Sequence, residues 1–105
     1  MSSMLPQKSI EDIHELRKEA GIWIRGLREK RGLSQRELAD QTETEYYTFV
    51  SQLETGRGRI PPEHYIKWAN ALGVEPKAFV KTLLQFYEPV TYDLLFPTQV
   101  EVAAQ

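Results

Sequence analysis

Side chains that can donate and accept hydrogen bonds are concentrated between residues 46 and 54, where Val50 and Leu53 recur at helical spacing. A helix fits the DNA major groove, where glutamine can pair with adenine and a threonine methyl can meet that of thymine. We therefore predict a helix that reads base edges with the face opposite Val50 and Leu53. The predicted base-contacting residues are Tyr46, Tyr47, Thr48, Ser51 and Gln52.

Adjacent tyrosines cannot share one face of a helix. We expect Tyr47 to face DNA, while Tyr46 or Phe49 packs on the protein. Ser51 has an alternative role, as a small residue that permits close approach.

A shorter helix is predicted just before this one. Ser34 is a good N-cap, and Glu37 three positions later completes a capping box. Leu38 and Ala39 then face inward, so the helix has barely two turns and is too short to be stable alone in water. Residues 41–45 favour a turn. The stretch therefore predicts two short helices joined by a turn, and their stability must come from packing.

Arginines beside these helices are suited to phosphate oxygens, which fix register without carrying sequence information. Arg57 and Arg59 lie on a glycine-flanked loop after the second helix, and Arg36 lies in the first turn of the shorter one. We predict that these three arginines contact phosphates.

These features resemble the lambda-repressor-like, or XRE-type, helix-turn-helix family over roughly residues 20–80. Two features depart from the family pattern. Glu43 stands where the family usually has glycine, and the stretch 38–54 is one residue longer. A left-handed non-glycine residue costs about 1 kcal/mol, so either the turn differs in type or the second helix begins differently. The base-contacting set is thereby defined to within one position. The matching residues are Ile24, Leu27, Arg28, 32–35, Leu38, Ala39, 50–54, Gly56 and 69–74.

The resemblance implies that Arg28 pairs with Glu54 at the end of the reading helix, with a phosphate contact as the alternative for Arg28. Pairing is favoured because a partly buried ion pair that loses one partner leaves an uncompensated charge. The resemblance also implies that Gln35 holds a phosphate, helped by the helix dipole. The alternative for Gln35 is an ordinary exposed first-turn residue.

The chain is predicted to be all-α. A helical extension covers residues 1–19, a five-helix helix-turn-helix domain covers 20–87, and a C-terminal tail covers 88–105. The tail is apolar between Pro89 and Pro97. It therefore either folds back on the core or forms a homodimer contact, and we favour the dimer because two-fold dimers reading two half-sites are common for this motif.

Glycine and proline mark the predicted helix ends. Ser9 caps a first segment, which Gly21 separates or bends from a helix over 22–31, and proline opens helices over 62–72 and 76–87. The expected apolar positions are Ile10, Ile13, Leu16, Trp23, Ile24, Leu27, Ile66, Trp68, Ala69, Leu72, Phe79, Val80, Leu83, Leu84 and Phe86.

Composition limits the possible classes of protein. A chain of 105 residues accommodates one domain, and the absence of cysteine excludes disulfides and thiolate metal sites. The net charge is −2, but residues 17–36 hold seven basic and two acidic residues, a local charge of +5. The sequence has no apolar run of about 18 residues and no signal-peptide pattern, so we expect a cytoplasmic protein without membrane contact.

No catalytic or metal-binding constellation is visible. His14 and His64 are far apart in the sequence, and neither lies near another metal ligand. A nucleophile elbow and a phosphate-cradling glycine loop are also missing. We therefore predict no enzyme activity, no cofactor and no metal.

The predicted function is a sequence-specific transcriptional regulator that binds double-stranded DNA. A homodimer is expected, because two-fold dimers are the common geometry for this motif. Two alternatives remain. One is an antitoxin that binds a toxin and represses its own operon. The other is an adaptor that recruits RNA polymerase through its acidic N-terminal helix.

Overall fold

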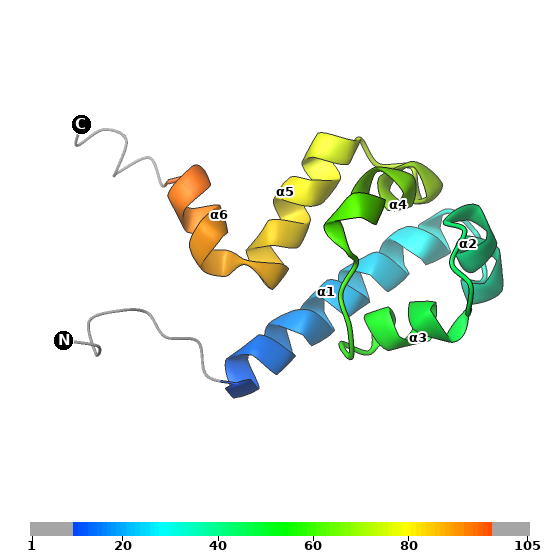
Figure 1. Ribbon diagram of the computed structural model, residues 1–105, viewed down its shortest axis with the longest axis horizontal. Coiled ribbons are helices and arrows are strands. Elements are labelled where there is room, and N and C mark those ends of the chain that lie inside the picture. Colours follow the sequence, from blue (N-terminus) through cyan, green and yellow to red (C-terminus); the bar gives the residue numbers. More distant parts are fainter. Residues whose placement is uncertain (1–9, 98–105) are drawn as a thin grey trace.

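The computed structural model describes residues 10–97, which form six α-helices, one short 3-10 helix and no strand (Figure 1). The all-α prediction is confirmed for these residues. The predicted Ser9 cap and residues 98–105 of the tail lie outside them. The elements are α1 Ile10–Lys30, α2 Gln35–Gln41, α3 Thr48–Glu54, η2 Pro62–His64, α4 Tyr65–Leu72, α5 Pro76–Tyr87 and α6 Pro89–Leu95.

The first helix, α1, runs without a break through Gly21, so the predicted separation into two helices is wrong. A Cβ atom built on Gly21 would lie 2.4 Å from the backbone oxygen of Glu54, at the end of α3. Glycine is therefore needed because two backbones meet, although in a sequence it indicates a helix break equally well. As a result, α1 joins the predicted N-terminal extension and the domain in one helix.

The two helices of the predicted motif are both present. Ser34 and Glu37 form the capping box of α2, as predicted. The helix predicted to read DNA, α3, begins at Thr48, two residues later than the predicted start at Tyr46. Tyr47 occupies its N-cap without a side-chain cap, and because tyrosine is not a capping residue, nothing in the sequence marked this boundary.

The core lies where α1, α2, α3, α4 and α5 pack together. Trp68 is fully buried, and the half-buried ring of Trp23 stacks on Phe79 with 5.4 Å between centroids. Ile66 was predicted to face inward but is 64% exposed. Two residues along a helix rotate the side chain by about 200°, so a face centred on Trp68 excludes Ile66. The largest fully buried side chains are Trp68, Phe79, Ile24, Leu38, Leu53, Ile60, Leu83, Val50 and Thr42.

The region predicted as a tail contains the helix α6, which begins at Pro89 and packs on α5. The Tyr92 and Phe96 rings lie 5.0 Å apart, and the Lys81 ammonium of α5 lies 4.6 Å over the Phe96 ring. Figure 1 shows α6 turned back beside α5, at the end of the molecule away from α2.

Candidate nucleic-acid interface

The helix α3 has one buried and one exposed face. Val50 and Leu53 are fully buried, whereas Thr48 and Gln52 are exposed and Ser51 is half-buried. The exposed side is therefore polar and able to hydrogen-bond, and the buried side anchors the helix to the core.

The two tyrosines before α3 are both exposed, Tyr46 at 66% and Tyr47 at 44%. The residue of this region that packs on the protein is Phe49, whose ring meets Trp68 edge-on at 6.4 Å. Of the two alternatives for the packed aromatic, the structure therefore selects Phe49.

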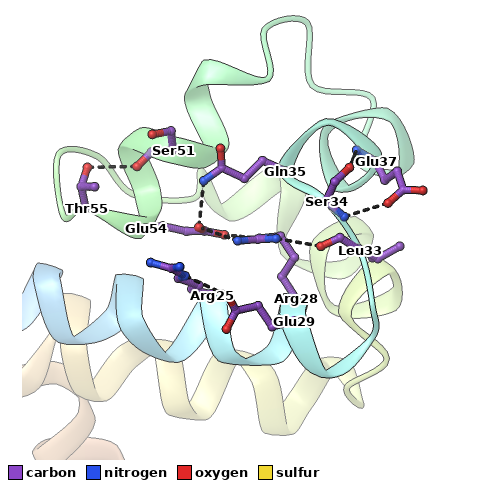
Figure 2. A network of polar contacts seen from close by, with 10 residues as sticks. All are labelled: Arg25, Arg28, Glu29, Leu33, Ser34, Gln35, Glu37, Ser51, Glu54 and Thr55. Atoms are coloured by element: carbon purple, nitrogen blue, oxygen red, sulfur yellow. Dashed lines mark hydrogen bonds and ion pairs between the residues drawn. The ribbon is translucent and has the colours of Figure 1, made fainter.

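On the side of α3 that faces the core, Arg28 and Glu54 form a buried ion pair (Figure 2). Arg28 Nε donates to Glu54 Oε2 at 2.6 Å, and Nη2 donates to Oε1 at 3.1 Å. Arg28 Nη1 donates to the backbone oxygen of Leu33 at 2.7 Å. The hydrogen bond from Arg28 to Glu54 raises the pKa of the guanidinium. One side chain thus ties the end of α3 to α1 and to the residues that precede α2.

Gln35, in the first turn of α2, joins this pair. Its amide Nε2 donates to Glu54 Oε1 at 3.0 Å (Figure 2). A side-chain amide has two N–H donors, so one remains for another acceptor. The network therefore fixes the position of Gln35 while leaving it one hydrogen-bond donor.

The turn between α2 and α3 contains Glu43 in a left-handed conformation, with φ of 55°. Lys67 of α4 donates to its carboxylate at 2.7 Å, which lowers the pKa of Glu43. Buried Thr42 donates to the backbone oxygen of Leu38 at 2.9 Å, and its hydroxyl lies 2.7 Å from that of Thr44. The family's left-handed turn is therefore kept despite the missing glycine.

The three arginines predicted to contact phosphate are placed differently. Arg57 is exposed and makes no ion pair with any residue in the described range 10–97. Arg59 is half-buried: its Nη1 lies 3.0 Å from Glu88 Oε2, and its guanidinium lies 4.7 Å over the Tyr87 ring. The guanidinium of Arg36 lies 4.5 Å over the ring of Tyr47.

No role was predicted from the sequence for three residues that hold this region in place, namely Thr42, Lys67 and Glu88. Lys67 and Glu88 have distant partners, Glu43 and Arg59, and the Thr42 hydroxyl bonds the last turn of α2 and Thr44. Helical periodicity of apolar residues carries no signal for these polar contacts. The loop after α3 is also held by Tyr87, whose buried hydroxyl accepts from the backbone N–H of Ile60 at 3.3 Å. Burial raises the pKa of Tyr87.

Residues 10–97 contain no group of three potential metal ligands from histidine, cysteine, aspartate or glutamate. In the same range, no helix is both long and apolar enough to cross a bilayer.

The described residues form an all-helical domain with two short helices joined by a turn. The second of these helices has an exposed polar face and is held to the core by a buried ion pair, which is the arrangement of a helix-turn-helix protein. The helix-turn-helix family matches residues 24–79, more than half of the chain. The chain therefore belongs to this family, in its lambda-repressor-like form, and is a DNA-binding transcription regulator and not an enzyme.

A solved structure supports this assignment. The chain is similar to the restriction-modification controller protein C.AhdI from Aeromonas hydrophila, with 32% identity and a TM-score of 0.54. The similarity covers 62% of this chain and 96% of the controller protein. A comparison with curated proteins found no match.

Proposed function

We propose that this chain is a sequence-specific regulator that acts in the cytoplasm and reads the DNA major groove with α3 and the two residues before it. The exposed polar face of α3, held rigidly by the buried network on its other side, is the observation that carries this proposal. Thr48 and Gln52 are the central base-reading residues, and Tyr46, Tyr47 and Ser51 flank them.

Phosphate contacts on either side of α3 would set the register. Arg57 suits this role because its guanidinium is exposed and unpaired in the described range. The second amide N–H of Gln35 lies in the first turn of α2, where the helix dipole favours an anion. Arg59 contributes by holding the loop through Glu88, and reaches phosphate only if that ion pair opens.

A second copy of the chain is the partner that best fits α6. Leu94 is 78% exposed, and Val90, Leu95 and Phe96 are exposed as well. An apolar hollow of about 350 Å³ lies between α5 and Phe96, which directly follows α6. Two-fold dimers place two reading helices on half-sites one turn of DNA apart, so a dimer through this region would bind a symmetric operator. The hollow is lined by Pro76, Lys77, Val80, Lys81, Leu84 and Phe96.

Selection of bound sequences from a random duplex library tests the reading proposal. The wild type should enrich a two-fold symmetric motif at about physiological salt, and a Thr48→Ala, Gln52→Ala double variant should blur its central positions. Asn70→Ala, an exposed change on α4, should leave the motif intact. Failure of the wild type to enrich any motif would overturn the proposal and favour a protein-binding role, as an antitoxin or a polymerase adaptor.

Sedimentation of the purified chain tests the dimer. Wild type should sediment as a dimer, and Leu94→Asp with Leu95→Asp should shift it to a monomer. Ile66→Asp is the matched control, because it adds a charge at an equally exposed isoleucine on α4. A wild-type monomer at concentrations where it binds DNA specifically would exclude α6 as the dimer contact.

A further inference from the structure

Arg36 differs from the paired arginines of this domain in what holds its side chain. Arg25, Arg28 and Arg59 each pair with a glutamate. Arg36 makes no hydrogen bond or ion pair among residues 10–97, and its guanidinium instead lies over the ring of Tyr47, 4.5 Å from the centroid. An exposed arginine is thus ordered by a ring while all its N–H donors stay free.

The neighbouring acids do not compete for this arginine. Asp40, four positions along α2, is the ordinary helical partner for Arg36, yet no ion pair forms between them in the described range. Glu37 is occupied in the capping box, where its carboxylate accepts from the backbone N–H of Ser34 at 2.8 Å. The stack is therefore the contact that orients the guanidinium.

This arrangement joins the two helices at the reading surface. Arg36 comes from the first turn of α2, whereas Tyr47 is the N-cap of α3. The guanidinium therefore lies beside the N-terminal end of the reading helix. Arginine commonly packs its guanidinium over an aromatic ring, and this contact uses none of its N–H donors. Two of these donors match the O6 and N7 atoms of guanine.

We propose that Arg36, stacked on Tyr47, reads a guanine at the end of the half-site that faces the N-terminus of α3. The pair acts as one specificity-determining unit: Tyr47 positions the guanidinium and Arg36 makes the base contact. This inference rests on the proposed function, because it requires α3 to occupy the major groove. It changes the role of Arg36 from a phosphate contact, which carries no sequence information, to a base contact, and the role of Tyr47 from a base contact to the positioning of Arg36.

Library selection with a set of full-length variants tests the unit. Arg36→Lys keeps the charge but loses the planar fork, and Tyr47→Leu removes the ring. Both should reduce the preference for one guanine per half-site by about tenfold while the positions read by α3 stay unchanged. Tyr47→Phe keeps the ring and should keep the guanine. Arg25→Lys is the matched control, since it alters an exposed arginine of α1 that pairs with Glu29 and has no proposed DNA contact, so it should leave the motif intact.

The two levels of the proposal fail in different ways. A wild-type motif that Arg36→Lys leaves unchanged overturns the stacked reader but not the proposed function. The same holds if Arg36→Ala weakens binding to all sequences alike and reduces the salt slope by about one, as a phosphate contact would. A wild type that selects no motif overturns both. Thermal melting of each variant verifies that the fold is retained, as expected for exposed side chains.

Discussion

The region behind α3 and the surface of α6 differ in how completely their side chains are partnered. Glu54 accepts hydrogen bonds from Arg28 and Gln35 and is buried. Leu94 and Leu95 of α6 are mostly exposed, and among the helices α6 packs mainly on α5. The first region is shaped before any ligand arrives. The second is an apolar surface of the kind that a monomer rarely leaves uncovered.

The two regions also differ in what their contacts achieve. A buried ion pair adds little net stability, because desolvation offsets much of the attraction, but removing one partner is costly. The Arg28–Glu54 pair therefore acts mainly by positioning α3. Exposed leucines contribute almost nothing to the folding stability of the monomer, and they stabilise the protein only when another surface buries them. Substitutions in the two regions should separate these effects.

The largest effect is expected from Arg28→Ala. It leaves the Glu54 carboxylate buried with Gln35 as its remaining side-chain donor, and should lower the free energy of unfolding by about 3–5 kcal/mol. Urea denaturation measures this change. Arg25→Ala is the control, because it removes an exposed pair with Glu29 in the same helix and should cost at most about 1 kcal/mol. Equal losses in the two variants would contradict the positioning role.

A smaller loss should follow Gly21→Ala. The new methyl group would overlap the backbone of Glu54, and overpacking of this kind costs about 1–3 kcal/mol. Gly26 lies in the same helix with nothing within 4 Å of a built Cβ. Gly26→Ala should therefore stabilise the protein by about 0.5–1 kcal/mol. Thermal melting of both variants should show shifts of opposite sign.

Acid should weaken the helix-turn-helix region by a smaller amount. Hydrogen bonds lower the pKa of three carboxyl groups from the ordinary 4.5: Glu37 through the Ser34 backbone, Glu43 through Lys67, and Glu75 through the backbone of Ala78 and Lys77. Because these pKa values are depressed in the folded state, the stabilisation is complete above pH 4.5 and is lost as the pH falls below it. Melting temperatures from pH 7 to 3 measure the decline. Glu75→Gln should make it shallower, and an unchanged profile would contradict the role of this cap.

The smallest effect on monomer stability is expected from Leu94→Ala. At a concentration too low for dimers, it should change the free energy of unfolding by less than about 0.5 kcal/mol. Leu53→Ala, on the buried face of α3, should cost about 2–5 kcal/mol under the same conditions. A large loss from Leu94→Ala in the monomer would show that α6 is part of the core and not a free contact surface.

Local signals in the sequence predicted much of this architecture. The capping box at Ser34 and Glu37, the proline at position 76 and the apolar spacing located α2 and α5. The helix predicted over 62–72 is present as α4 from Tyr65, while Pro62 opens the 3-10 helix η2 before it. These signals involve residues close in the chain, so they need no knowledge of tertiary packing.

The errors arose where distant residues decide the structure. Gly21 was read as a break because the α3 backbone that it contacts lies more than thirty positions along the chain. The turn at Glu43 is completed by Lys67, and the Arg59 side chain is held by Glu88. The stack of Arg36 on Tyr47 likewise joins two helices. None of these pairings follows from spacing within one helix, so a single sequence could not reveal them.

The contact at Gly21 also governs how the reading helix opens to solvent. With no side chain at Gly21, the backbone at the end of α3 packs directly against α1, which is the longest helix of the described residues. Amide protons of α3 should therefore exchange with deuterium only when the whole domain opens, whereas those of α6 should exchange through local fraying. Although α3 is too short to be stable alone, its amide protons should then exchange as slowly as those of α1, against which it packs.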